Sequence, residues 1–252
     1  MRDVDDVGDA VRDLTDGRGA DVIYDPVVAN AAQIVAHATP AIGNIDSSTD
    51  TPVYIGDAAD TAQLTAISGA SFSGGILAML PYLTGFGSDG QFAWSVINSP
   101  SDFAGVGSGE AFIAKQKVIR GLPLRGGPSA SPSGLLWSLN ALTRAYYAGG
   151  TTIFGFDTLS ENTTILSAMS PIEYDGVYFW PGAERFMMFN GAVRELPNTN
   201  SFNYFYDNLN QAHAEKIYSF RNTRFGEIWW CYPRGNATEC THAVIYNVRE
   251  NT

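Results

Sequence analysis

The chain has 252 residues, of which 45% are hydrophobic and 12% aromatic, and its formal net charge is −11. This composition excludes a disordered polymer, and the length suits one large all-β domain or two smaller ones. The charge argues against sequence-specific binding of DNA or RNA, because a groove that holds nucleic acid is basic. The same charge would suit a channel wall past which DNA slides without adhering, because an acidic face repels phosphate.

The first forty residues predict a helix followed by a strand. Apolar residues recur at helical spacing over residues 7–14, "GRG" then ends the helix, and "ADVIYDPV" predicts a buried strand that stops at Pro26. A helix–turn–strand unit of this kind is typical of parallel α/β sheets. We therefore separate residues 1–41 as a small α/β segment that could dock on another protein.

The text "GRGADVIYDPV" also resembles one segment of the medium-chain quinone and alcohol dehydrogenases. In that family the Gly-rich phosphate loop lies well upstream, whereas here only residues 1–6 precede the helix, and no G-x-G-x-x-G follows a strand. The predicted helix also starts among aspartates, which would repel a phosphate group. We expect no binding of NADH or NADPH and no cofactor.

Residues 61–88 carry no charge, which raises the question of a membrane segment. The stretch is rich in Ser, Thr and Gly, and Pro81 interrupts its most apolar part, whereas a membrane helix would be more uniformly apolar. The first twenty residues are acidic and do not form a secretory signal. We interpret residues 61–88 as buried strands and expect no stable membrane insertion.

From residue 42 to residue 252 the sequence predicts a mainly β body of short antiparallel strands. A glycine followed by an apolar or aromatic run recurs at intervals of 42 to 59 residues, at Gly75, Gly134, Gly176 and Gly226. Asp-Gly and Asn-Gly pairs, the strongest short hairpin signals, mark turns at residues 89–90, 175–176 and 190–191.

A loose period of this length, with several short strands in each repeat, is typical of β-propeller blades. An irregular β-sandwich with coincidental glycines is the alternative. At most four blade-like units can be counted after residue 42, and the final strand has no partner after it. We therefore predict a propeller-like body with incomplete blades, which would join other copies in a ring.

Aromatic residues cluster near the C-terminus, at Trp229, Trp230 and Tyr232. Successive strand residues face opposite sides, so the two tryptophans cannot line one platform. We predict that one packs between sheets and that the other faces a neighbouring element or subunit. Cys231 and Cys240 lie nine positions apart without histidines at zinc-ligand spacing, so we expect free or buried thiols and no metal site.

An enzyme that cleaves sugar chains would need two carboxylates flanking one glycosidic bond. The candidates are Asp157, Glu173, Asp175, Glu184 and Glu227. Each also has a structural interpretation: Asp175 precedes a turn glycine, and Glu173 and Glu227 are polar alternates in predicted strands. "SDGQFAW" from Ser88 lacks the S-x-D-x-G-x-x-W spacing of the sialidase aspartate box. We expect no catalytic residues and no enzymatic activity.

A module that binds host glycans is a further alternative, because exposed aromatic rings stack on sugars. The candidates for such a role are Tyr146, Tyr147, Tyr204 and Tyr206. Aromatic residues on β-strands more often belong to a core or an interface.

The body contains long pieces that resemble structural proteins of tailed bacteriophages, chiefly short-tailed ones. These pieces are "KVIRGLPLRGG" (117–127), "SPSGLLWSLNALTR" (131–144), "ILSAMSPIEYDGVYFWPGAERFMMFNGAVRELPN" (165–198), "NYFYDNLN" (203–210) and "FGEIWWCYPRGNATECTHAVIYNVREN" (225–251). The resemblance spans residues 74–252 and implies a virion protein similar to tail hub or nozzle components. Relatives usually continue beyond "YNVRE" and do not begin with a dehydrogenase-like segment.

For this chain the resemblance implies a place in the virion tail. The implied partners are other copies of the chain in a ring and neighbouring tail proteins such as the adaptor and the tail fibre. Genomic DNA would pass through without specific binding.

Overall fold

The fold is taken from a computed structural model, which divides the chain into two compact units. The first unit contains residues 1–41 and 46–121, and the second contains residues 42–45 and 122–252. The structure describes residues 20–25, 33–38, 51–57, 60–125, 132–197 and 200–251. The helix expected over residues 7–14 lies outside these ranges. The boundary that we drew at residue 42 stays a prediction.

The first sheet of the first unit corrects one expectation. It contains β1 (Ala20–Asp25), β2 (Gln33–Ala38), β3 (Thr51–Asp57) and β4 (Asp60–Phe72), in that order. The strand expected in "ADVIYDPV" is present as β1, but it pairs antiparallel with β2. It therefore does not belong to a parallel α/β sheet, because the next strand returns directly beside it.

The second sheet of the first unit follows the predicted hairpins closely. It contains β5 (Gly75–Met79), β6 (Tyr82–Phe86), β7 (Gln91–Trp94) and β8 (Gly109–Phe112), in that order. Asp89 and Gly90, between β6 and β7, have φ angles of 54° and 76°, which are the left-handed values of a tight hairpin turn. The charge-free stretch 61–88 thus forms strands, as expected. No helix among the described residues is both long enough and apolar enough to cross a membrane.

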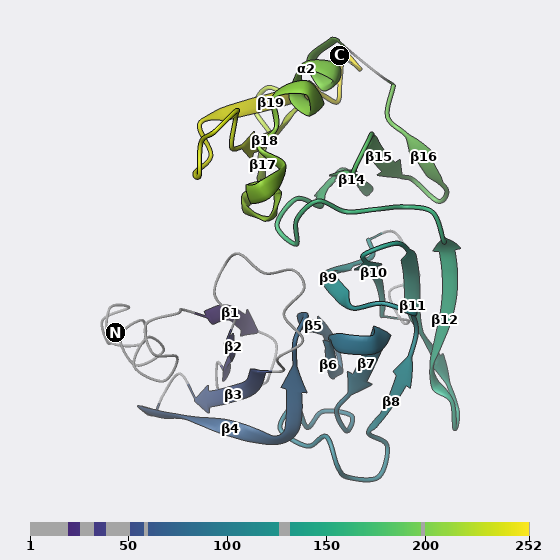
Figure 1. Ribbon diagram of the computed structural model, residues 1–252. Coiled ribbons are helices and arrows are strands. Elements are labelled where there is room, and N and C mark those ends of the chain that lie inside the picture. The colour runs from purple at the N-terminus through teal and green to yellow at the C-terminus, as the bar shows by residue number, and fades with distance from the viewer. Residues whose placement is uncertain are drawn as a thin grey trace. The chain divides into compact units, whose positions relative to one another are not determined.

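The remaining strands form three further sheets. The first contains β9 (Val118–Pro123), β10 (Ser133–Ser138), β11 (Leu142–Gly149) and β12 (Ile153–Ser160). The second contains β13 (Ile172–Tyr174), β14 (Val177–Pro181), β15 (Phe186–Phe189) and β16 (Val193–Glu195), and the third contains β17 (Tyr218–Asn222), β18 (Glu227–Tyr232) and β19 (His242–Asn247). In Figure 1 the strands of each sheet lie side by side in chain order.

The prediction of a mainly β chain of short antiparallel strands is therefore confirmed. Among the described residues there are four four-stranded sheets and one three-stranded sheet. A four-stranded meander is the unit of a propeller blade, so the sheets are blade-like. The recurring glycines lie at or beside the strands β5, β10, β14 and β18, which explains the loose period in the sequence.

An aromatic core fills the space between β13–β16 and β17–β19. Its largest buried side chains include Phe186, Phe205, Trp230 and Tyr232. The helix α2 (Asn200–Asn208) contributes Phe202 and Phe205 to this core. Phe186 contacts both of these rings as well as Trp230, with ring centroids 4.1 to 5.1 Å apart. The two sheets and α2 thus share one hydrophobic core.

Candidate functional site

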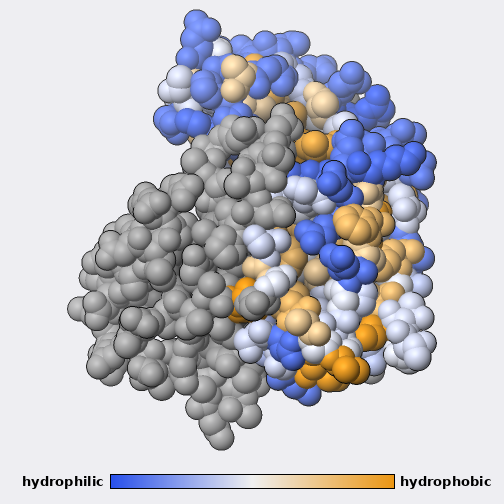
Figure 2. Space-filling model, turned by 60° about the horizontal axis from the view of Figure 1, so that its bottom comes forward, coloured by the Kyte–Doolittle hydropathy of each residue, from blue (hydrophilic) through white to orange (hydrophobic). Residues whose placement is uncertain are grey.

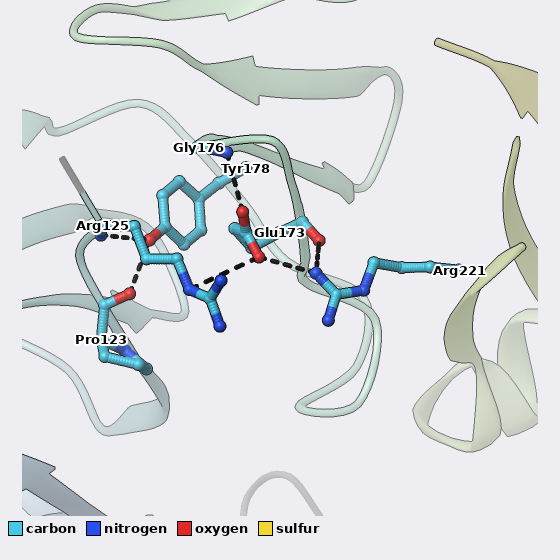
Figure 3. Close-up of polar contacts among 6 residues, drawn as sticks. All are labelled: Pro123, Arg125, Glu173, Gly176, Tyr178 and Arg221. Carbon is cyan, nitrogen blue, oxygen red and sulfur yellow. Dashed lines mark hydrogen bonds and ion pairs between the residues drawn. The ribbon is translucent and has the colours of Figure 1, made fainter. Parts of the chain in front are cut away.

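A polar contact network of the second unit surrounds Glu173, and we call it the Glu173 cluster. Its members are Pro123, Arg125, Glu173, Gly176, Tyr178 and Arg221 (Figure 3). They come from the end of β9 and the chain after it, from the hairpin β13–β14 and from β17. The cluster therefore connects parts of three sheets.

The hairpin turn places the Glu173 carboxylate. Asp175 and Gly176 have φ angles of 50° and 81°, the paired left-handed values that an Asp-Gly turn favours. This turn directs the Gly176 N–H toward Oε1 of Glu173, at 2.7 Å. The expectation that Asp175 is a turn residue is thus confirmed.

Two guanidinium groups approach the other oxygen of Glu173. Arg221 Nη1 donates to Oε2 at 2.7 Å and to the Glu173 carbonyl oxygen at 2.9 Å, and Arg125 Nε lies 3.8 Å from Oε2. The Glu173 side chain is only 13% exposed, while those of Arg125 and Arg221 are 68% and 40% exposed. The largely buried carboxylate is therefore held by cations that remain open to solvent.

Tyr178 extends the cluster toward the end of β9. Its hydroxyl donates to the Pro123 carbonyl oxygen at 2.5 Å and accepts the Arg125 N–H at 2.9 Å. Burial raises the pKa of this hydroxyl, and the nearby Glu173 carboxylate raises it further, against the opposing backbone hydrogen bond. Tyr178 thus stays protonated and acts as a fixed donor and acceptor between two chain segments.

The arrangement is suited to holding sheets together. Both carboxylate oxygens of Glu173 already accept hydrogen bonds from the protein. A general acid or nucleophile acting on sugar would need a second carboxylate across from it. The contacts of Glu173 instead connect the hairpin β13–β14 to Arg221 on β17 and to Arg125 after β9.

Three other candidate carboxylates each have hydrogen-bond or ion-pair partners of their own. Asp157 on β12 pairs with Arg144 on β11. Glu184 is 82% exposed and lies 3.9 Å from Arg185, in the turn after β14. Glu227 accepts hydrogen bonds from Asn222 Nδ2 and Trp229 Nε1. Each of these contacts lies within one sheet or one turn. The absence of enzymatic activity stays a prediction.

The four tyrosines considered for glycan binding differ in exposure. Tyr206 donates to the Gly182 carbonyl oxygen and packs against Phe186, and burial raises its pKa well above the usual value. Tyr146 and Tyr147 on β11 are half-buried. Tyr204 is 47% exposed, with the Arg234 guanidinium 5.2 Å from its ring centroid. Tyr204 is therefore the most exposed of the four, but the Arg234 guanidinium lies over its ring.

The aromatic cluster on β18 follows the predicted alternation. Trp230 is fully buried between sheets and donates from Nε1 to the Ser170 carbonyl oxygen at 3.0 Å. Trp229 is half-buried on the opposite face, where it stacks on Phe220 with ring centroids 5.5 Å apart. The prediction that one tryptophan packs between sheets and the other lies on the opposite face is confirmed, and that Trp229 faces a neighbouring element or subunit stays a prediction.

The two thiols are free, as expected. Cys240 Sγ donates to the Lys216 carbonyl oxygen at 3.2 Å. Burial raises the pKa of Cys240 to about 11, so this thiol is protonated at neutral pH. Within the described ranges, no group of three His, Cys, Asp or Glu side chains gathers as a metal ion would require.

Sequence reasoning missed the roles of Arg125, Tyr178 and Arg221. These residues lie about fifty positions from their partners, so no local pattern links them. It also missed α2, although Phe202 and Phe205 follow helical spacing in "NSFNYFYDN". That spacing was the available signal for the helix.

Comparison with known proteins assigns no family. No protein-family model matches the chain, and no curated protein matches it. Among solved structures, a chain in the crystal structure of a nidogen/laminin complex is similar at 8% identity and a TM-score of 0.41. The similarity covers 92% of this chain and 80% of that chain. No functional conclusion follows from a similarity at this level.

Proposed function

We propose that this chain is a structural subunit of a bacteriophage tail, of the hub or nozzle type, and that it performs no catalysis. It would assemble with copies of itself and with neighbouring tail proteins around the path of the DNA. The observation that carries the proposal is that the carboxylates of Glu173, Asp157 and Glu227 are each held by hydrogen bonds or ion pairs to other groups of the protein. Contacts of this kind stabilise strands and sheets, which supports a structural role.

The resemblance to tail proteins supports the same proposal. Its longest pieces, residues 165–198 and 225–251, contain the sheets β13–β16 and β18–β19, which share the aromatic core. Side chains that are buried together in this way constrain one another, because core packing tolerates few changes of volume. The net charge of −11 would suit a channel wall that DNA passes without adhering.

A glycan-binding or glycan-degrading tail module is the second candidate. The observation in its favour is the half-exposed pair Phe220 and Trp229 beside the Glu227 carboxylate, which combines apolar rings with a hydrogen-bond acceptor. Binding of the purified chain to a glycan array, lost in Trp229→Ala, would support it. Release of reducing sugar from a bacterial polysaccharide, lost in Glu227→Gln, would establish degradation.

Immunogold labelling of phage particles that encode the chain tests the structural proposal. Antibodies raised against the purified chain should label the tail, and mass spectrometry should find its peptides in purified particles. Antibodies pre-absorbed with the chain serve as the control. Peptides found only in the infected-cell lysate and never in purified particles would contradict a structural role in the virion.

A further inference from the structure

Asn190 and Gly191 form a turn that the proposed function does not use. They follow β15, and the pairing of Phe189 with Val193 closes the loop before β16. Both residues are exposed to solvent. Much of the surface drawn in Figure 2 is hydrophilic, and asparagine is among the chemically least stable side chains on such a surface. The turn is therefore a candidate for covalent change.

The local geometry leaves the Gly191 nitrogen accessible to the Asn190 side chain. Gly191 has a φ angle of 102°, and a Cβ atom added to it would meet no atom within 4 Å. The Asn190 N–H donates to the Ala192 carbonyl oxygen at 3.4 Å. Within the ranges that the structure describes, neither the Asn190 carboxamide nor the Gly191 N–H takes part in a hydrogen bond. Both groups are thus free to react with each other.

Two other exposed asparagines in turns, Asn98 and Asn236, differ at this point. The N–H that follows each of them is already bonded. The Ser99 and Ala237 N–H groups donate to the carbonyl oxygen of the residue three positions earlier, at 3.1 and 3.0 Å. A nitrogen whose proton is held in this way is a poorer nucleophile, and Ser99 and Ala237 also carry a Cβ that crowds the approach. Asn190 is thus distinguished by its local structure and not by exposure alone.

We propose that Asn190 is a site of spontaneous deamidation, in which the Gly191 nitrogen attacks the side-chain carboxamide and water is the second reactant. The chemical class of the modification is amide hydrolysis through a cyclic imide. The proposal does not rest on a role in a phage tail, because it uses only the turn, its hydrogen bonds and its exposure.

The reaction proceeds in two balanced steps. In the first, the Gly191 nitrogen loses its proton and forms a bond to Cγ of Asn190. The bond from Cγ to Nδ2 breaks, and the amino group takes up a proton and leaves as ammonia, so that a succinimide ring remains. In the second step, water adds to one of the two carbonyl carbons of the ring and opens it. Opening at one carbonyl gives aspartate and opening at the other gives isoaspartate, and nothing is oxidised or reduced.

The modification would act on the pairing of β15 with β16. Either product adds one negative charge to a chain whose net charge is already −11. Isoaspartate also lengthens the backbone by one methylene beside Phe189, which is buried and packs near the Tyr178 ring. The longer loop no longer fits the register of Phe189 with Val193, so the ladder between β15 and β16 should loosen.

Peptide mass mapping of the full folded chain, incubated at mildly alkaline pH in water enriched in heavy oxygen, tests the proposal. The peptide that contains Asn190 should gain the mass difference between a carboxamide and a carboxyl group that carries one heavy oxygen. Both aspartate and isoaspartate should be found, because the ring opens at either carbonyl. Peptides that contain Asn98 and Asn236 should react at least several-fold more slowly in the same incubation.

Asn190→Gln removes the site, because a glutamine side chain would have to close a larger ring. It should abolish the change at residue 190, and circular dichroism should show an intact fold, since this side chain is exposed. Asn98→Gln is the matched control, because it makes the same change in another exposed turn. It should leave the reaction at Asn190 unchanged.

A folded chain in which Asn190 does not react would overturn the proposal, and reaction in urea alone would show that the folded turn blocks the attack. Aspartate formed without isoaspartate would contradict the cyclic route. Equal rates at Asn190, Asn98 and Asn236 would show that the bonded N–H groups make no difference, and would overturn the structural argument as well.

Discussion

The two faces of the sheet β17–β19 perform different tasks. The inner face presents Ile228, Trp230 and Tyr232, each 2% exposed or less, to a core shared with β13–β16 and α2. The outer face presents Phe220 and Trp229, which stack on each other but leave their rings partly open. The same strands thus stabilise the fold on one side and offer a surface on the other. Alternation along a strand is sufficient to separate the two tasks.

Trp230→Ala should have the largest effect on stability. The ring is fully buried, contacts Phe186 and donates a hydrogen bond to Ser170. Its removal should lower the free energy of unfolding by about 3–5 kcal/mol, the usual cost of truncating a large buried aromatic side chain. Equilibrium unfolding in urea measures this difference. A change as small as that of Trp229→Ala would show that the inner face is not packed.

Glu173→Ala should have the next largest effect. Arg221 belongs to the inner row of β17, opposite Ile228, and reaches Glu173 at the rim of the core. Removing the carboxylate leaves the Gly176 N–H and both guanidiniums without this acceptor, at a cost of about 1–3 kcal/mol. Glu173→Gln keeps an acceptor oxygen and should cost less in the same urea titration. Equal losses in the two variants would show that charge, and not hydrogen bonding, carries the contact.

Tyr206→Phe should lower stability by about 0.5–1.5 kcal/mol at neutral pH, since it removes the hydrogen bond to Gly182. It should also change the pH dependence. Burial raises the pKa of Tyr206 in the folded chain above the unfolded value near 10. Its protonated form therefore favours folding below pH 10, and this contribution declines as the pH rises further.

The measurement for Tyr206 is the free energy of unfolding between pH 9 and pH 11. The wild-type chain should lose stability more steeply above pH 10 than Tyr206→Phe does. Parallel curves for the two chains over this range would contradict burial of the hydroxyl.

Trp229→Ala should have the smallest effect on folding. The ring contributes a cross-strand pair with Phe220, worth about 0.2–1 kcal/mol. Its loss should weaken association between chains more than it weakens the fold. Urea unfolding compared with sedimentation velocity on one preparation separates the two effects. A loss of several kcal/mol in unfolding would remove the distinction between the faces.

The strands and their turns could be predicted because their signals are local. The glycine-led apolar runs became β5, β10, β14 and β18, and the Asp-Gly pairs at residues 89–90 and 175–176 became tight turns. The alternation of Trp229 and Trp230 followed from the period of a strand. The antiparallel pairing of β1 could not be predicted, because "GRGADVIYDPV" indicated a strand of a parallel α/β sheet. In the structure β1 pairs instead with the next strand along the chain, β2.

The Glu173 cluster could not be predicted from the sequence for a related reason. Glu173 was identified as a candidate carboxylate, but its partners Arg125 and Arg221 lie about fifty residues away on either side. Only the order in which the sheets pack brings them together. The direction of each backbone group on β19 depends on hydrogen-bond parity, which a sequence does not display.

Residue-resolved hydrogen exchange at low and high protein concentration tests the division between the two sides of this sheet most directly. The amides of Val244 and Tyr246, which point toward β18, should be protected at both concentrations. The amides of Ala243, Ile245 and Asn247, which point away from β18, should exchange faster at both concentrations. Equal protection of the two sets of amides would contradict the alternation on which the two faces of this sheet depend.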